Sequence, residues 1–258
     1  MRIVVKVGTS TLAHSTGNLN IRHMEELCKV LSDIKNAGHE VLLVSSGATG
    51  MGAGKLGLVE KPEDIAAKQA AAAVGQCELM YTYDRLFEQY GHCVAQILLT
   101  RMDVEDEDHR ANLHNTLFRL LEYRALPVIN ENDSVATEEF FIGENDTLAA
   151  MVGGIVGADL IVLLSDIDGL FTADPHLDPE AELISDVREI KPELLEMAGG
   201  PDNELGSGGM YSKLKAAETA MSVGCDMIIA SGSQPDILYD IVEGKSAGTR
   251  FWAGGDNS

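Results

Sequence analysis

Short, continuous apolar runs recur along the chain and alternate with longer segments of helical periodicity. The runs are rich in Val, Ile and Leu and lack the polar alternation of a half-exposed strand. Such runs are typical of strands that are buried on both faces of a parallel sheet. We expect the clearest strands at residues 3–7, 41–44, 126–129, 159–164 and 226–230, and weaker ones at 92–99, 135–142, 183–187 and within 244–252.

Between these runs, apolar residues recur every three or four positions, as they do on one face of a helix. Asn20 is expected to cap the first of these helices, and Gly38 to end it. The alternation of strands and helices predicts a three-layer αβα sandwich with a mainly parallel central sheet, as a single domain over residues 1–258. The helices are expected at 21–34, 62–89 with a break near Gly75, 112–123, 147–156, 192–197, 210–223 and 235–242.

Polar residues follow strand after strand at the point where each strand ends. The carboxyl ends of parallel strands lie at one edge of a sheet, which is where open α/β sheets bind ligands. The repetition is therefore better evidence for a cleft than any one motif. The polar ends are 45–48, 130–133, 165–169 and 231–232.

Lys6 interrupts the first apolar run and is followed by Gly8, Thr9 and Ser10. A buried ammonium group without a partner is costly, so Lys6 is expected near the end of its strand, facing an anion or a cleft. Backbone N–H groups and hydroxyls after the strand suit a phosphate. The alternative is a lysine that extends to solvent beside an ordinary turn.

A second lysine, Lys213, follows the glycine-rich segment 206–209 at the start of a predicted helix. A glycine turn that opens a helix offers free N–H donors and the positive end of the helix dipole. The alternative is a flexible linker with a surface lysine. Together with Lys6, Lys213 could offset the charge that develops during phosphoryl transfer.

Two further segments invite motif assignments that their context does not support. The run from Gly50 to Gly57 contains G-x-G-x-x-G, but it does not open a helix directly after a strand. Leu56 also stands where a P-loop needs Ser or Thr. We expect this run to be a mobile loop over the site, and the charged run 103–110 to be a solvated loop or a helix start.

Three small polar clusters are candidates for binding the acceptor substrate. Ser46 could bind a carboxylate through its hydroxyl, or simply belong to a turn. Asp133 could bind an ammonium group, or form an Asx-turn. Asn145 and Asp146 recur at the start of a predicted helix whose N-terminus would point at the ligand that they surround.

Composition restricts the class of partner. The chain has 19 Lys and Arg against 41 Asp and Glu, a formal net charge of −22. Nucleic acids and anionic membranes are therefore excluded as main partners, because both need a basic surface. The four cysteines show no metal or disulfide spacing and are expected to be reduced core thiols. With no signal segment or apolar membrane span, the expected location is the cytoplasm.

Several spaced motifs together resemble the amino-acid kinase family. They are VVKVGTSTL with Lys6, SSGA at 45–48, PVINENDSVA at 127–136, GENDTLAA at 143–150, LLSDIDGLFTADP at 163–175 and GSGGMYSKLKAA at 206–217. Within the family, they resemble the enzymes that phosphorylate the side-chain carboxylate of L-glutamate with ATP, the first step of proline biosynthesis. The resemblance spans nearly the whole chain and implies the family's fold.

By motif position, the resemblance implies a role for each candidate residue. Lys6 and Lys213 would contact the phosphates of ATP, and Asp146 would orient these lysines or take part in Mg²⁺ binding. L-Glutamate would be held by Ser46, Asp133 and Asn145. The nucleotide would also be bound by Ser165, Asp166, Ser207, Gly208, Gly209, Met210, Tyr211 and Ser212.

The resemblance also implies proline as a feedback inhibitor, γ-glutamyl phosphate reductase as the next enzyme, and a homo-oligomer. Many relatives continue into a C-terminal PUA domain, whereas this sequence stops soon after Trp252, so a short form is expected. Two alternatives stay open. One is another acceptor on the same fold, namely N-acetylglutamate, aspartate, carbamate or a nucleoside monophosphate. The other is a sensor that binds ligand without turnover.

Overall fold

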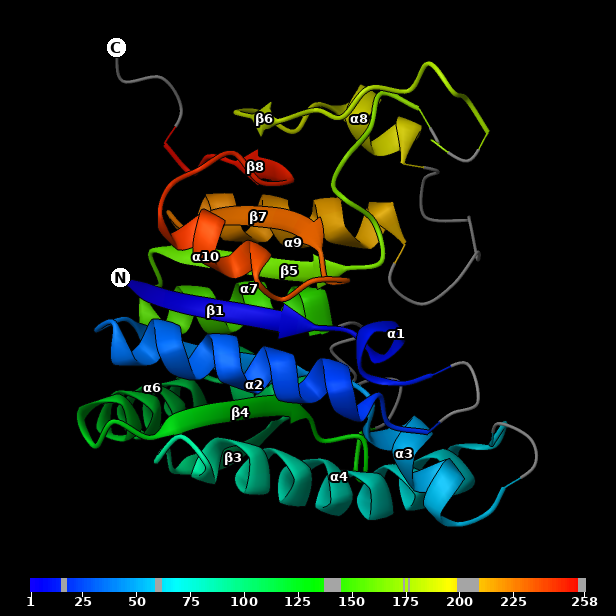
Figure 1. Ribbon diagram of the computed structural model, residues 1–258, viewed down its shortest axis with the longest axis vertical. Helices are drawn as coiled ribbons and strands as arrows, with labels where there is room; N and C mark the ends of the chain where they lie inside the picture. Colours follow the sequence, from blue (N-terminus) through cyan, green and yellow to red (C-terminus); the bar gives the residue numbers. More distant parts are fainter. Residues whose placement is uncertain are drawn as a thin grey trace.

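Strand β1 (Arg2–Val7) lies near the middle of the central sheet in the computed structural model (Figure 1). The structure describes residues 1–14, 18–58, 62–136, 145–173, 175, 177–198 and 209–254. Within these residues the sheet has eight strands in the order β3-β4-β2-β1-β5-β7-β8-β6, and only the β7–β8 pair is antiparallel. The predicted mainly parallel sheet is confirmed. The other strands are β2 (Glu40–Ser45), β3 (Val94–Leu99), β4 (Leu126–Glu131), β5 (Leu160–Ser165), β6 (Asp186–Val187), β7 (Asp226–Ser231) and β8 (Thr249–Phe251).

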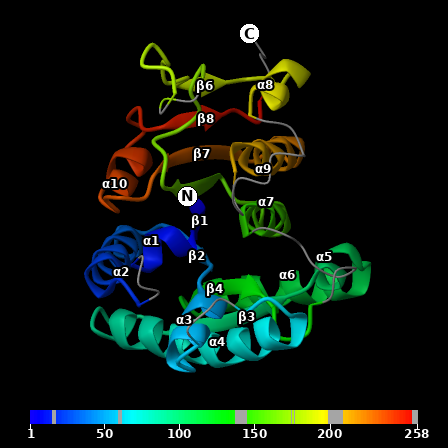
Figure 2. The same cartoon turned by 90° about the vertical axis from the view of Figure 1, so that its right-hand side faces the viewer.

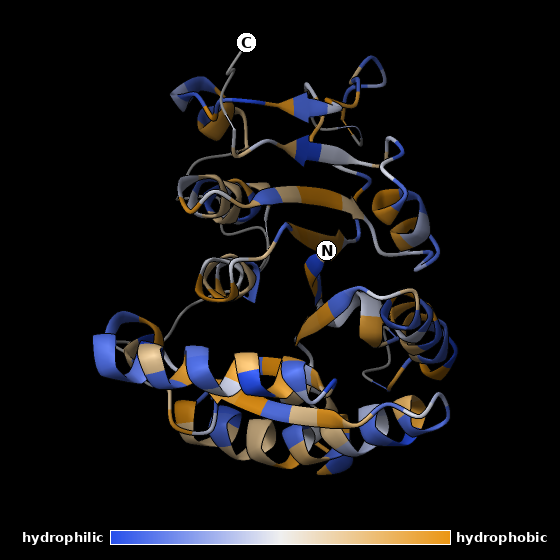
Figure 3. Ribbon diagram, turned by 90° about the vertical axis from the view of Figure 1, so that its left-hand side faces the viewer, coloured by the Kyte–Doolittle hydropathy of each residue, from blue (hydrophilic) through white to orange (hydrophobic). Residues whose placement is uncertain are grey.

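Helices cover both faces of the sheet because successive strand residues point to opposite sides. Val4 packs into one core cluster, whereas Ile3 and Val5 pack into the other. Figure 2 shows the two helical layers on either side of the strands, and Figure 3 shows that the central strands are largely hydrophobic. The predicted three-layer sandwich is confirmed. One layer contains α6 (Glu107–Glu122), α7 (Asn145–Val156) and α9 (Met210–Ser222); the other contains α2 (Ile21–Asn36), α4 (Ile65–Glu88) and α10 (Ile237–Val242).

Local signals set most helix ends. The Asn20 side chain caps α2 by accepting a hydrogen bond from the His23 N–H (3.2 Å), and Gly38 follows α2 with φ +100°. The helix expected from residue 62 begins at Ile65 as α4, with Asp64 as its N-cap. The charged run 103–110 proves to be a helix start, because the Asp106 carboxylate accepts hydrogen bonds at the beginning of α6. The short helices are α1 (Thr9–Leu12), α5 (Arg101–Glu105) and α8 (Pro192–Met197).

The glycine-rich run after β2 is a helix, α3 (Ala48–Lys55), so the prediction of a mobile loop is wrong. This helix packs so closely on α4 that a Cβ on Gly52 would lie 1.7 Å from the Ala71 carbonyl oxygen. A Cβ on Gly75 would lie 1.7 Å from the Ala48 carbonyl oxygen. Gly75 therefore marks a helix contact and not the predicted break, and α4 continues through it.

We expect Gly75→Ala to lower the free energy of unfolding by about 3 kcal/mol, since its Cβ would overlap backbone atoms that cannot rotate away. Urea unfolding at constant m-value measures this loss. Gly50→Ala is the matched control, because its Cβ would lie 3.9 Å from the nearest atom. That change should be neutral or stabilising by up to about 1 kcal/mol. Equal stability of the two variants would contradict the close helix contact.

Three other expectations have mixed outcomes. The strand predicted at 135–142 falls mostly outside the described residues, and Val135 lies in a turn. Cys28 and Cys225 are buried as predicted, but Cys77 and Cys93 are exposed, so the prediction of four core thiols is wrong for these two. In the described part of the chain, none of the helices is long and apolar enough to span a membrane.

Candidate active site

Two lysines and one aspartate form a buried charged cluster where β1 ends. The Lys6 Nζ lies 2.6 Å from Asp146 Oδ1, and the Lys213 Nζ lies 3.3 Å from Asp146 Oδ2. The residues are 8%, 4% and 0% exposed for Lys6, Lys213 and Asp146, respectively. Two ammonium groups therefore share one carboxylate. A pair of lysines held in this way can stabilise an anionic ligand.

The topology explains how these three residues meet. Lys6 is the fifth residue of β1. Its side chain points to the same face of the sheet as that of Val4, the face that α7 and α9 cover. Asp146 lies in the first turn of α7, and Lys213 lies one turn into α9. Both helices therefore begin near the strand end. The prediction that Lys6 lies near the end of its strand and faces a charged site is confirmed.

A small residue next to the cluster leaves room beside the lysine. A Cβ on Gly8 would lie 3.4 Å from the Lys6 Nζ, so a side chain at this position would lie against the ammonium group. Gly232, after β7, is similarly confined, since its Cβ would lie 3.1 Å from the Thr11 Cγ2. These two glycines therefore keep side chains out of the space that follows β1 and β7.

A row of amide hydrogen bonds joins two of the residues that are predicted to bind the phosphoryl-acceptor substrate. The Asn145 Nδ2 donates to the Ser46 Oγ (2.8 Å) and to the Asn130 Oδ1 (2.9 Å). The Asn130 Oδ1 also accepts from the backbone N–H of Glu131 (2.9 Å). Because a backbone N–H can only donate, it fixes which end of the Asn130 amide is oxygen. Asn145 must then present its NH₂ group, and its carbonyl oxygen faces away from Asn130.

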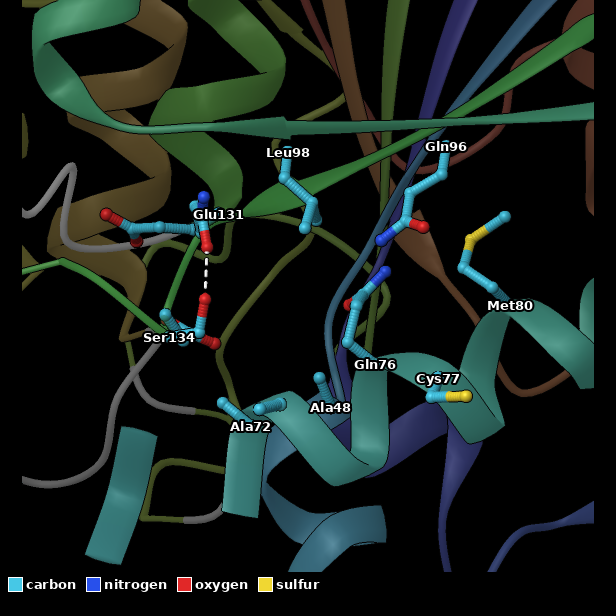
Figure 4. Close-up of a pocket in the computed structure, with 12 residues that line it drawn as sticks. Ala48, Ala72, Gln76, Cys77, Met80, Gln96, Leu98, Glu131 and Ser134 are labelled. Carbon is cyan, nitrogen blue, oxygen red and sulfur yellow. Dashed lines mark hydrogen bonds between the residues drawn. The ribbon is translucent and has the colours of Figure 1, made fainter. Parts of the chain in front are cut away.

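Asp133 follows closely after Asn130 and lies in the wall of a cavity of about 370 Å³. Burial raises the pKa of the Asp133 carboxyl above its ordinary value. Figure 4 shows how α4, β3 and the segment after β4 enclose the cavity. The cavity is lined by Ala48, Ala72, Ala73, Gln76, Cys77, Met80, Gln96, Leu98, Glu131, Asn132, Asp133 and Ser134.

The predicted nucleotide residues lie at the ends of β5 and around the start of α9. The Ser165 hydroxyl donates to the Asp166 carboxylate (3.0 Å), and the Gly232 N–H donates to the Ser165 carbonyl (2.6 Å). Gly209 is the N-cap of α9, whose first residues are Met210, Tyr211 and Ser212. Ser207 and Gly208 lie outside the described residues.

Two residues of the site were not selected from the sequence as candidates. Asn130 belongs to a polar strand end, but its central place in the hydrogen-bond chain depends on contacts from α4 and α7. Gln76 carried one usable signal, since it is one of two amide side chains, with Gln69, in an alanine-rich segment. A polar side chain among small apolar residues of a helix is usually exposed to solvent; where it is buried, it needs a polar partner.

The described residues contain no cluster of three or more His, Cys, Asp or Glu side chains that could hold a metal ion. Both oxygens of Asp146 face lysine ammonium groups, which compete with a cation. Magnesium that accompanies a nucleotide is usually held by phosphate oxygens and water, with one or two carboxylates.

A model of the amino acid kinase family matches residues 1–231. The chain therefore belongs to the amino acid kinase family. Among its curated relatives, the glutamate 5-kinase of Clostridium tetani (strain Massachusetts / E88) is 51% identical over 249 residues, which are 96% of this chain and 93% of the relative. The glutamate 5-kinase of Clostridium perfringens (strain 13 / Type A) is 50% identical over 98% of this chain and 95% of the relative.

Solved structures share the fold at low sequence identity. The isopentenyl phosphate kinase of T. acidophilum, in a product complex, has a TM-score of 0.68 at 18% identity and covers 97% of this chain and 100% of its own. The carbamate kinase from Giardia lamblia bound to AMP-PNP has a TM-score of 0.68 at 15% identity, with 97% and 98% covered. At this identity the likeness shows the fold alone.

Proposed function

We propose that this chain is a glutamate 5-kinase, which transfers the γ-phosphoryl group of ATP to the side-chain carboxylate of L-glutamate. The products are γ-glutamyl phosphate and ADP. The observation that carries the proposal is the buried Lys6–Asp146–Lys213 cluster next to the Ser46–Asn145 hydrogen bond. Relatives named glutamate 5-kinase at about half identity support the choice of acceptor.

The reaction needs alignment and charge stabilisation rather than proton transfer. A side-chain carboxylate is already ionised at pH 7, so an oxygen can attack the γ-phosphorus without a general base. The new P–O bond forms as the bond to the bridging oxygen of ADP breaks. We assign Lys6 and Lys213 to stabilise charge on the transferred group and the leaving oxygen, and Asp146 to fix the separation of the two lysines.

We assign substrate and nucleotide to different sides of this cluster. Ser46, Asn145 and Asp133 would hold the glutamate, with the Asp133 carboxylate facing its ammonium group. Ser165, Asp166 and residues 207–213 would hold the nucleotide. Magnesium would enter as part of the MgATP substrate, since the described residues offer no metal centre of their own.

Several expectations from the resemblance stay predictions. Proline would compete as an inhibitor near the glutamate subsite. A reductase would consume the product, because an acyl phosphate is labile. We also expect self-association, a cytoplasmic location, and one amino-acid kinase domain over residues 1–258.

A coupled assay of ADP release tests the proposal with L-glutamate, N-acetylglutamate, aspartate, carbamate and a nucleoside monophosphate. We expect turnover with L-glutamate, and trapping with hydroxylamine should give the γ-glutamyl hydroxamate. Turnover of N-acetylglutamate without turnover of L-glutamate would contradict the proposed acceptor. Binding of glutamate and ATP without ADP release would instead favour the sensor hypothesis.

The KM for glutamate is expected to rise as the pH falls. The rise should begin at a higher pH than the pH at which an exposed aspartate is protonated. Burial raises the pKa of Asp133, so its ionised form, which pairs with the substrate ammonium, is lost early on acidification. Steady-state kinetics between pH 5 and 8 at about physiological salt, where screening of a buried pair is weak, measure this effect. Asp133→Asn should have a high KM that lacks this pH-dependent rise, and the KM for ATP serves as the internal control.

A further inference from the structure

Gln76 is a buried amide that faces two ways. It is 8% exposed and lies in the cavity wall. Its Oε1 accepts a hydrogen bond from the Asn130 Nδ2 (2.9 Å). Its Nε2 is buried and has no hydrogen-bond partner among the residues that the structure describes. A buried donor that lacks a partner costs about 1–3 kcal/mol, so this NH₂ group calls for an acceptor that the described residues do not supply.

The orientation of the Gln76 amide follows from the protein backbone. The Glu131 N–H requires the Asn130 oxygen on its side, which turns the Asn130 NH₂ group toward Gln76. Gln76 must then offer its oxygen to Asn130, and its own NH₂ group is left on the other side. The same backbone donor thus sets both Gln76 and Asn145, at opposite ends of one hydrogen-bond chain.

The cavity wall indicates which ligand group meets this donor. Asp133 supplies a carboxylate for a cation, whereas Gln76 supplies amide hydrogens for an oxygen. Figure 4 shows Gln76 extending from α4 toward Gln96, with Glu131 and Ser134 at the other end of the cavity. Apolar side chains such as Met80 and Leu98 complete the lining. An amino acid carries both kinds of group, an ammonium for the Asp133 carboxylate and a carboxylate for the Gln76 donor.

We propose that Gln76 donates a hydrogen bond to the α-carboxylate of the acceptor amino acid and selects acceptors in which this carboxylate is free. This inference rests on the proposed function and adds a specificity-determining residue to it. Gln76 also holds Asn130, so a bound carboxylate is linked to the position of Asn145 through direct hydrogen bonds. An α-carboxamide has one acceptor oxygen in place of two and no negative charge, so it should bind this donor more weakly than the carboxylate does.

The test compares L-glutamate with its α-carboxamide, which keeps the side-chain carboxylate that accepts the phosphoryl group. The wild-type chain should strongly prefer L-glutamate. Gln76→Glu keeps the volume and the oxygen for Asn130, but replaces the donor by a carboxylate oxygen at pH 8. We expect kcat/KM for L-glutamate to fall roughly 10²-fold, mainly through KM, and the preference over the carboxamide to fall at least as much.

Gln96→Glu is the matched control, because it adds the same charge to the same cavity from β3. It should leave the preference between the two acceptors nearly unchanged. The KM for ATP should stay constant in both variants. An unchanged preference in Gln76→Glu, or an equal shift in Gln96→Glu, would overturn the assignment. If Gln76→Glu does not fold, Gln76→Met removes the donor without adding charge and should also reduce the preference.

These outcomes separate the inference from the function on which it rests. Failure of the wild-type chain to phosphorylate L-glutamate would contradict the proposed function. In that case, calorimetric titration of the wild-type chain and Gln76→Glu with L-glutamate and with its α-carboxamide still tests the donor. Binding that does not distinguish the two compounds in the wild-type chain would overturn the role of Gln76.

Discussion

Asp146→Asn is expected to lower kcat by roughly 10² or more and the free energy of unfolding by about 3 kcal/mol. The catalytic loss follows because the carboxylate fixes the spacing of the two lysine ammonium groups. The stability loss follows because the variant leaves two buried positive charges without their shared counterion. Initial rates at saturating ATP and L-glutamate measure the first effect, and urea unfolding of the ligand-free protein measures the second.

Asp240→Asn is the control for this change. Asp240 also pairs with a lysine, at 2.8 Å from the Lys245 Nζ, but its side chain is 51% exposed. A surface ion pair contributes about 0–1 kcal/mol, so both activity and stability should stay close to those of the wild-type chain. Near-wild-type turnover of Asp146→Asn would remove the assigned role of the lysine pair in catalysis.

The sequence predicted the sheet and most helices because their signals are local. Continuous apolar runs predicted the strands, and Asn20 with Gly38 correctly marked the ends of α2. The polar strand ends were also informative, since a parallel sheet brings all of them to one edge whatever the strand order. This is why the sequence alone predicts that Lys6 and Lys213, which lie at opposite ends of the chain, belong to one site.

The errors arise where distant contacts outweigh local preference. Glycines in the run 50–57 disfavour a helix, yet α3 forms because Gly52 allows it to pack on the backbone of α4. Gly75 resembles a helix break in the sequence, but in the structure it allows the backbone of Ala48 in α3 to approach α4. Gln76 was missed for a related reason, since its role depends on Asn130 from another part of the chain.

Lys213→Met is expected to lower kcat by roughly 10² or more, as Asp146→Asn does, but to leave the ligand-free protein about as stable as the wild-type chain. In this variant Asp146 keeps its 2.6 Å ion pair with Lys6, so its buried carboxylate still has a counterion. The loss of one lysine of the pair should therefore cost far less stability than the loss of the carboxylate that both lysines contact. The stabilisation that ATP confers on the protein should fall as well, because one phosphate contact is lost.

Lys215→Met is the matched control, since Lys215 lies on the same helix, has a side chain that is 42% exposed and pairs with Glu218 at 2.8 Å. Its kcat and its stabilisation by ATP should be unchanged. The contrast between Lys213→Met and Asp146→Asn decides what the cluster is for. If the cluster were only a structural ion-pair network, both variants would lose stability and neither loss would depend on ligand. If the cluster binds phosphate, Asp146 is required for the stability of the ligand-free protein. Lys213 is then required for catalysis and for the stabilisation that ATP confers, and not for the stability of the ligand-free protein.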